Sequence, residues 1–206
     1  MKLLSLFIVF EGLDGSGKST QQQLLNDKLQ SDKISNISFR EPGSTVIGEK
    51  IVKILQSDQK LSPLSELLLF YVSRSAIIEE KIKPALANYD VVICDRYFYS
   101  SVAYQGYGRG MNIGFINQIN DEVVKNIIPD LIFYMDISWE EKKKRKGIDI
   151  NDRFEKEDRV FHNKVRSGYK SMAKKDSDKW KIIDAEENVE NISSFIYETV
   201  KYNLNT

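Results

Sequence analysis

Residues 6–20 read LFIVFEGLDGSGKST, and this stretch alone indicates the fold. Leu6–Phe10 is a continuous apolar run, typical of a strand that is buried on both faces in a parallel sheet. Residues 12–19 match the pattern G-x-x-x-x-G-K-[ST], in which the glycines let backbone N–H groups curl around phosphate oxygens. A helical segment, Ser19–Gln30, follows and adds the positive end of its dipole. Strand, loop and helix in this order predict a site for the phosphates of a nucleoside triphosphate.

Two positions of this loop have defined chemistry. Lys18 is expected to reach the β- and γ-phosphates, and the Ser19 hydroxyl is expected to ligate Mg²⁺, the predicted cofactor. We predict that ATP contacts nine consecutive residues, Gly12, Leu13, Asp14, Gly15, Ser16, Gly17, Lys18, Ser19 and Thr20, and also Arg145 further along the chain.

Composition limits the remaining possibilities. The chain has 206 residues, which suits one α/β domain spanning 1–206, and its 30 Lys+Arg balance 30 Asp+Glu. This balance argues against bulk binding of nucleic acid or of an anionic membrane surface. Cys94, the one cysteine, ends an apolar run and reads as a buried strand residue. Since Met1–Phe10 reads as a first strand rather than a signal peptide, and no apolar stretch has the length of a membrane span, we predict a cytoplasmic protein.

Short apolar runs alternate with longer segments of helical period along the chain. The pattern predicts a three-layer α/β fold: a five-stranded parallel sheet with helices on both faces. The predicted strands are Leu6–Phe10, Ile37–Arg40, Val91–Cys94, Leu131–Asp136 and Trp180–Asp184. The predicted helices are Ser19–Gln30, Val46–Gln56, Pro63–Asn88, Gly114–Ile127, Glu155–Lys174 and Val189–Leu204.

Polar residues follow several predicted strands where each strand ends. The phosphate loop follows the first, Arg40–Gly43 the second, Asp95-Arg96 the third and Asp184-Ala185 the fifth. Because ligands gather at the carboxyl ends of parallel strands, we expect these residues to share one site. A carboxylate at Asp95 can hold Mg²⁺ together with Ser19, and a guanidinium at Arg96 can bind a phosphate.

Among proteins with such a loop, the length favours a kinase of nucleoside monophosphates. A GTPase would carry a guanine-reading N-K-x-D late in the chain, and this sequence has none. An ATPase module usually has a longer chain.

Six segments, in this order, resemble the bacterial thymidylate kinases over essentially the whole chain. They are 10–20 (FEGLDGSGKST), 40–43 (REPG), 69–74 (LFYVSR), 95–106 (DRYFYSSVAYQG), 129–131 (PDL) and 152–155 (DRFE). The resemblance implies the P-loop nucleoside monophosphate kinase fold, with transfer of the γ-phosphate of MgATP to dTMP. It also implies a homodimer, formed through the helices predicted at Val46–Gln56, Pro63–Asn88 and Gly114–Ile127.

The resemblance assigns the acceptor site residue by residue. It implies that Phe70 stacks on thymine, that Arg74 reaches the base and its phosphate side, and that Tyr104 crowds the 2′ position of the sugar. Asp14 would contact the 3′-hydroxyl, and Arg96 would clamp the acceptor phosphate. The implied substrate-binding residues are Asp14, Glu41, Phe70, Arg74, Arg96, Ser100, Ser101, Tyr104 and Gln105.

The family brings positive charge to the γ-phosphate either from the phosphate loop or from a lid. Gly15 and Ser16 are uncharged, so we expect a lid at about 142–154 to supply the charge. Arg153 is the predicted lid arginine and Arg145 the second choice, while the lysines of 142–146 equally suit a solvated helix face. The predicted catalytic residues are thus Lys18, Asp95, Arg96 and Arg153.

Some features depart from the family pattern or leave alternatives open. Val52 stands where bacterial members commonly carry an arginine, so Lys50 or Lys53 would have to replace one phosphate contact. His162 belongs to no motif and is expected to have no catalytic role. A deoxynucleoside kinase that uses Glu41 as its acid remains an alternative. A nucleotide-binding regulatory module without turnover is the other.

Overall fold

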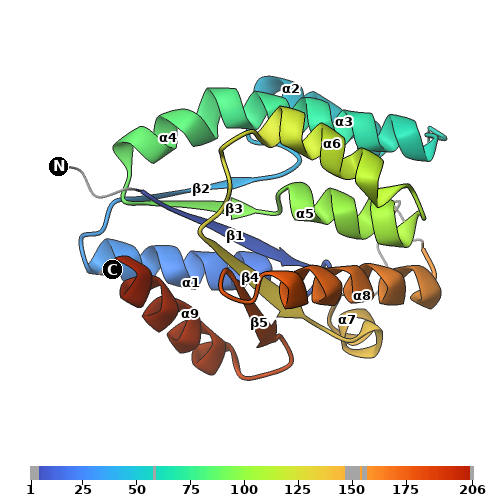
Figure 1. The fold of residues 1–206 in the computed structure, drawn as a ribbon. Helices are drawn as coiled ribbons and strands as arrows, with labels where there is room; N and C mark the ends of the chain where they lie inside the picture. Colours follow the sequence, from blue (N-terminus) through green and yellow to red (C-terminus); the bar gives the residue numbers. More distant parts are fainter. Residues whose placement is uncertain (1–4, 58, 147–153, 155–156, 205–206) are drawn as a thin grey trace.

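A computed structural model describes residues 5–57, 59–146, 154 and 157–204. Its five strands form one parallel sheet in the order β2-β3-β1-β4-β5 (Figure 1). They are β1 (Leu6–Gly12), β2 (Asn36–Arg40), β3 (Val91–Asp95), β4 (Leu131–Asp136) and β5 (Trp180–Asp184). The five predicted strands are confirmed, with ends that differ by at most two residues.

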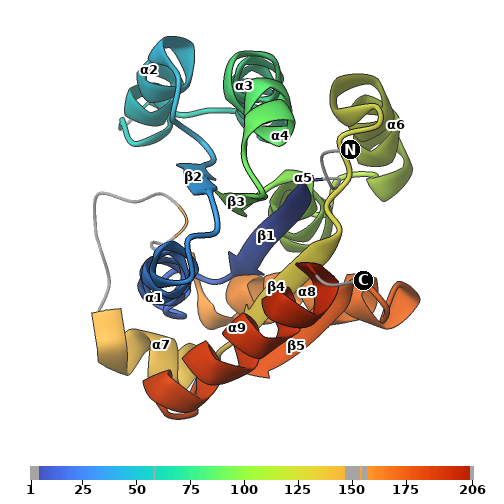
Figure 2. The same ribbon diagram turned by 90° about the vertical axis from the view of Figure 1, so that its left-hand side faces the viewer.

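Helices cover both faces of the sheet, as the apolar runs predict (Figure 2). One side of β1 packs through Ile8 and Phe10 against Leu25 of α1 (Lys18–Ser31) and Ile196 of α9 (Val189–Leu204). The alternate residues of β1 pack against α3 (Pro63–Ile77), α4 (Lys83–Asn88) and α6 (Ile113–Val124). The helix α8 (Arg159–Lys175) lies on this second side, where its Tyr169 ring stacks on Tyr134 with centroids 5.0 Å apart.

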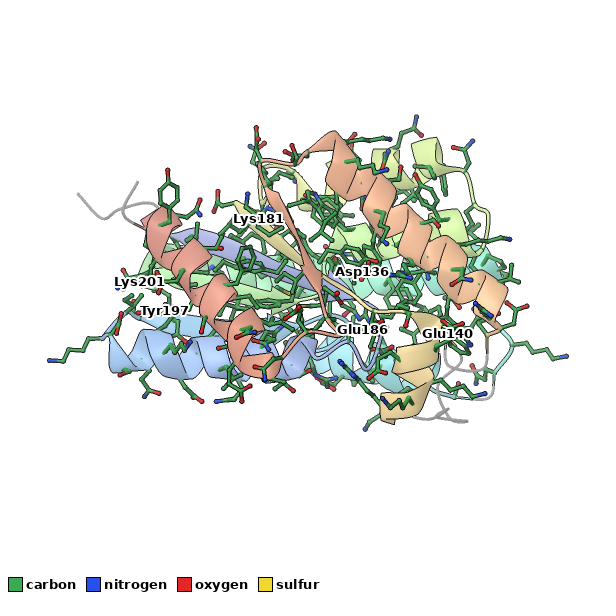
Figure 3. All side chains as sticks on the ribbon, turned by 90° about the horizontal axis from the view of Figure 1, so that it is seen from below. Asp136, Glu140, Lys181, Glu186, Tyr197 and Lys201 are labelled. Atoms are coloured by element: carbon green, nitrogen blue, oxygen red, sulfur yellow. The ribbon has the colours of Figure 1, made fainter. Side chains whose placement is uncertain are left out.

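Polar contacts fasten the last helix to the first. Tyr197 and Lys201 of α9 both bind the Asp32 carboxylate at the end of α1, Lys201 at 2.8 Å (Figure 3). Exposed contacts of this kind contribute little individually. The buried residues Leu29 and Val200 in the same layer therefore account for most of the attachment of α9.

The predicted helix Pro63–Asn88 is continuous but not uniform. A π-helical segment, η1 (Ile78–Ile82), separates α3 from α4. The helix α2 (Val46–Leu55) precedes α3 and is capped by Thr45, whose side chain accepts a hydrogen bond from the Gly48 N–H.

Two helical stretches were not among the predicted helices. One comprises α5 (Phe98–Ser101) and the π-helical η2 (Val102–Gly108), which lie inside the motif at 95–106. The other is α7 (Trp139–Lys146), so the start of the expected lid is a helix. The predicted helix at 155–174 begins at Arg159 with Asp158 as its N-cap, while residues 155 and 156 lie outside the described residues. No helix in the described part of the chain has the length and apolar character that a membrane span requires.

Candidate active site

The phosphate loop joins the end of β1 to the start of α1. Gly15 and Gly17 have φ angles of 78° and 89°, in the left-handed region that favours glycine. Gly17 is the N-cap of α1, and no side chain caps the helix there. The first N–H groups of α1 therefore point to the place where a phosphate would lie.

Lys18 lies folded against its own loop. Its Nζ donates to the carbonyl oxygens of Gly12 at 3.2 Å and Leu13 at 3.1 Å, and it lies 4.0 Å from Asp14. Only 5% of Lys18 is exposed. Burial, together with repulsion from Arg96, lowers the pKa of Lys18. A phosphate bound in the loop would offset both effects, because its negative charge favours the ammonium form.

Ser19 and Asp95 meet across the strands β1 and β3. The Ser19 hydroxyl donates to Asp95 Oδ2 at 3.4 Å, and Asp95 Oδ1 is buried without a hydrogen-bond partner. A hydroxyl beside a carboxylate oxygen that lacks a donor fits Mg²⁺, which prefers oxygen ligands and takes few of them from protein. The described residues include no cluster of three or more His, Cys, Asp or Glu residues that could hold a metal ion.

A pocket of about 240 Å³ opens beside this pair. Eight of the nine implied substrate-binding residues line it, which brings together strand ends and helices far apart in the sequence. Its lining consists of Asp14, Arg40, Glu41, Pro42, Val52, Leu55, Gln56, Phe70, Asp95, Arg96, Ser100, Ser101, Tyr104, Gln105 and Phe154.

The ninth residue, Arg74, lies behind the pocket wall. It is 1% exposed and donates to Glu41 Oε2 at 2.8 Å, to Ser101 Oγ at 3.0 Å and to the Tyr97 carbonyl at 3.2 Å. The structure thus places its guanidinium on two lining side chains rather than in the pocket itself. Burial raises the pKa of the partner carboxyl, Glu41, to about 7, although Arg74 opposes this change.

Arg96 has an unusual backbone and a well-defined side chain. Its φ of 67° is left-handed, which is costly for a residue with a Cβ and is found where the surrounding structure enforces it. Its N–H donates to the Phe10 carbonyl at 2.8 Å, and its guanidinium donates to Asp14 at 2.8 Å. The guanidinium also lies over the Tyr104 ring, 5.3 Å from the centroid. These contacts aim a cation at the space between the phosphate loop and the pocket.

A buried carboxylate that sequence analysis missed supports this arginine. Glu11 is fully buried and accepts hydrogen bonds from the Tyr97 N–H at 2.9 Å, the Ser100 hydroxyl at 2.6 Å and the Tyr169 hydroxyl at 2.8 Å. Ser100 and Tyr169 in turn accept from Arg96, at 3.3 and 3.4 Å. Burial raises the pKa of Glu11, and the positive charge of Arg96 works against it. The sequence does contain a signal for this role of Glu11. A charged residue at the end of an apolar strand is expected to be buried, and a buried charge requires hydrogen-bonding partners.

The expected lid is only partly described. Arg153, the predicted lid arginine, lies outside the described residues. Arg145, the second choice, donates to Glu141 at 2.9 Å and to the Ala185 carbonyl at 2.8 Å, after β5. Lys142 is not on a solvated face, because it is 1% exposed and its Nζ lies 4.7 Å from the Trp139 ring centroid. Phe154, quoted in a motif but given no role, lines the pocket.

The structure also describes position 52, where Val52 stands in place of the arginine that bacterial members commonly carry. Val52 lines the pocket, whereas Lys50 and Lys53 are exposed and do not line it. Arg40, which was expected at the shared site but was not among the implied substrate-binding residues, does line it and binds both oxygens of Glu49 at 3.1 Å.

His162 and Cys94 do not line the pocket. His162 is 2% exposed, and its ring stacks on Trp139 at 4.5 Å. Burial and the nearby Lys142 lower the pKa of His162 to about 4. The Cys94 thiol is buried and free, and burial raises its pKa.

Comparisons of the sequence and of the structure with known proteins find similarity to thymidylate kinases. A family model described as thymidylate kinase matches residues 10–196. The chain is 40% identical over 196 residues to a thymidylate kinase of Caldanaerobacter subterraneus, covering 95% of this chain and 94% of the relative. It is 41% identical over 203 residues to one of Thermosipho africanus, covering 97% and 99%. A crystal structure of thymidylate kinase from Ehrlichia chaffeensis is similar with a TM-score of 0.79 and 33% identity, over 97% of this chain and 99% of that one.

Proposed function

The chain belongs to the thymidylate kinase family, and from this membership we propose how its residues carry out the family's reaction. That reaction is transfer of the γ-phosphoryl group of ATP to dTMP, which gives dTDP and ADP for dTTP synthesis. The observation that carries the proposal is the pocket of about 240 Å³, lined by eight implied dTMP-binding residues and adjoining the phosphate loop.

The donor nucleotide is held by the loop between β1 and α1. Backbone N–H groups at the start of α1 bind its phosphates, and Lys18 exchanges its two carbonyl contacts for phosphate oxygens. Ser19 and Asp95 would hold Mg²⁺, which would offset charge on the β- and γ-phosphates when bound.

The acceptor nucleotide lies in the pocket with its phosphate toward the loop. Phe70 stacks on thymine, Tyr104 excludes a 2′-hydroxyl, and Gln105 and Ser101 bind the base edge. Arg96 binds the acceptor phosphate, and Arg40 is a second cation of the lining that replaces the arginine absent at Val52. Arg74 acts from behind the wall, by orienting Glu41 and Ser101.

The transfer itself needs little covalent chemistry from the protein. The attacking phosphate oxygen of dTMP is already ionised at neutral pH, so no general base is required. Positioning and positive charge supply the rate. Asp14, within 2.8 Å of Arg96, fixes that guanidinium between the two nucleotides. Arg153 of the lid supplies the remaining charge to the γ-phosphate.

We further propose that the enzyme is a homodimer in the cytoplasm. Leu64, Leu68 and Val72 are spaced four apart on α3, and each is 46% exposed. Neighbouring apolar residues of α2, Ile47 and Ile54, are also exposed. An apolar stripe of this kind is typical of a protein interface. The single free cysteine suits a reducing compartment.

A coupled assay of ADP release with dTMP, dUMP, UMP and thymidine tests this function. We expect dTMP to be the preferred acceptor, and we expect removal of magnesium by a chelator to abolish turnover. Turnover of thymidine without turnover of dTMP would favour the deoxynucleoside kinase. Nucleotide binding without turnover of any acceptor would favour the regulatory module.

A further inference from the structure

A buried glutamate contacts the pocket residue Gln105 from outside the pocket. Glu66 lies in the first turn of α3 and is 2% exposed. The Gln105 amide nitrogen donates to Glu66 Oε1 at 2.9 Å. Gln105 lines the pocket, whereas Glu66 does not. The Gln105 amide therefore connects this carboxylate directly to the pocket.

An arginine keeps this carboxylate in place. Arg109 donates to Glu66 Oε1 at 3.4 Å and to Oε2 at 3.3 Å. Arg109 is itself fixed by Glu157 and by the Phe161 ring, which lies 4.9 Å from its guanidinium carbon. Because Glu66 is ion-paired in a buried position, it presents oxygens that only accept hydrogen bonds.

An accepting carboxylate dictates which way the Gln105 amide turns. An amide has an NH₂ group on one branch and an oxygen on the other, and it can rotate to offer either one. With the carboxylate on one side, the NH₂ branch must face Glu66, since two oxygens face to face repel. The oxygen branch is then the one turned away from Glu66, and Gln105 offers the pocket an acceptor.

The orientation of this acceptor separates the pyrimidine bases. Thymine and uracil carry an N–H at ring position 3, which donates to an oxygen. Cytosine has an unprotonated nitrogen at that position, which only accepts, so two acceptors would meet. A site that leaves buried polar groups unpaired rejects the wrong ligand strongly.

We propose that Glu66 is a positioning residue that sets base specificity, because it fixes the Gln105 amide with its oxygen available to an N–H of the bound base. The inference rests on the proposed function, in which the pocket holds the base of a nucleoside monophosphate. It adds a residue outside the pocket to those that select thymine over cytosine.

The test compares dTMP with dCMP in the wild type and in Glu66→Gln. A glutamine at 66 can offer either an oxygen or an NH₂ group, so Gln105 is free to turn. We expect the ratio of kcat/KM for dTMP to that for dCMP to fall at least about tenfold, mainly through KM. Glu157→Gln is the matched control, because it removes the other carboxylate that binds Arg109 and leaves the Glu66–Gln105 contact intact. This variant should keep the wild-type ratio of kcat/KM for dTMP to kcat/KM for dCMP.

The outcomes are distinguishable. If Glu66→Gln lowers both kcat/KM values by the same factor, Glu66 is merely structural and the proposal is wrong. If the wild type does not phosphorylate dTMP at all, the proposed function fails instead.

A measurement on the wild type covers the case in which Glu66→Gln does not fold. The Gln105 side-chain NH₂ signals are followed by nitrogen-15 NMR and assigned by their loss in Gln105→Glu. We expect slow exchange with solvent before dTMP is added and little change in shift afterwards, because these protons face Glu66. A large shift on dTMP binding, indicating that the NH₂ group donates to the base, would overturn the proposal.

Discussion

Arg74 and Glu41 form an ion pair with 2.8 Å between Nε and Oε2, and both side chains are almost fully buried, at 1% and 3% exposed. Such pairs are costly to desolvate, so their presence is weak evidence for added stability. Removing one partner is costly, because the other is then left buried without its counter-charge and must either stay charged there or change its protonation state. A substitution in this pair should therefore change both the pocket wall, to which Glu41 belongs, and the free energy of unfolding.

Arg74→Met should destabilise the protein by about 3–5 kcal/mol. The loss of the guanidinium should also raise the pKa of Glu41 further above its value of about 7, since Arg74 opposes the effect of burial. Urea denaturation measures the free energy of unfolding. The double variant Arg74→Met/Glu41→Leu should recover much of the loss, and equal destabilisation of the single and double variants would show that the buried charge is not the cause.

Gly12 and Gly17 both have positive φ but differ in their surroundings. A Cβ at Gly12 would lie 2.6 Å from the Met135 carbonyl oxygen, whereas a Cβ at Gly17 meets nothing within 4 Å. Gly12→Ala should therefore cost about 3 kcal/mol or more, from strain and overpacking together. Gly17→Ala should cost only about 1–2 kcal/mol, from the left-handed backbone alone. Thermal unfolding of the two variants, side by side, tests the order, and equal losses would contradict it.

His162 should make the protein less stable in mild acid. Its folded pKa of about 4 lies below its ordinary value of 6.5, so between these values the unfolded chain binds a proton that the folded chain does not. Stability is then present above pH 6.5 and is lost as pH falls towards 4, by about 3 kcal/mol.

His162→Phe keeps a ring beside Trp139 and should abolish this share of the pH dependence, seen as the difference between variant and wild-type denaturation curves. The sequence has one histidine, so the wild-type imidazole signal in a proton NMR titration needs no assignment. A measured pKa near 6.5 would contradict the prediction.

Leu68→Lys should dissociate the proposed dimer, because it places a charge in the middle of the exposed stripe on α3. Light scattering after size-exclusion chromatography gives the mass directly. Val160→Lys is the control, since Val160 is 59% exposed but lies on α8. A dimer that survives Leu68→Lys would place the interface elsewhere.

Arg153→Ala should lower turnover by about 10³-fold or more while leaving dTMP affinity nearly unchanged, as expected for a cation that stabilises charge only during transfer. Single-turnover kinetics and calorimetry separate the two quantities. Arg145→Ala is the informative comparison, because Arg145 already binds Glu141 and Ala185. A larger loss of turnover in Arg145→Ala would make Arg145 the catalytic lid residue.

The strands and most helices were predictable because the hydrophobic pattern that indicates each one lies within its own stretch of sequence. Val91–Cys94 and Leu131–Asp136 are apolar runs, and a parallel sheet covered on both faces is the arrangement that buries them. The helix at Phe98–Gly108 was not predictable in the same way. Its segment contains two glycines and several aromatic residues, which are poor helix formers. Packing of Val102, Ala103 and Tyr104 into the core stabilises it instead.

The pocket lining was largely predictable because motif residues at strand ends must converge on one edge. The sequence does not show which side chains line the pocket and which contact the lining residues from outside it. Arg74 is in the expected motif, yet its direction depends on Glu41, Ser101 and Tyr97, which two other segments supply. Glu66 and Tyr169 are identified only by their contacts, since neither stands in a phosphate or acceptor motif.

The hydrogen bond between Glu11 and Tyr169 has a consequence for biosynthesis. The two residues are 158 positions apart, so β1 leaves the ribosome well before the hydroxyl that completes the environment of its carboxylate. Synthesis at about 5–20 residues per second makes this interval roughly eight to thirty seconds. Until Tyr169 emerges the carboxylate has at most the donors of Tyr97 and Ser100, and a carboxylate that lacks a donor opposes burial of the first strand in a sheet. The nascent chain should therefore delay closing its central strand until α8 has emerged, and nucleotide binding should begin only then.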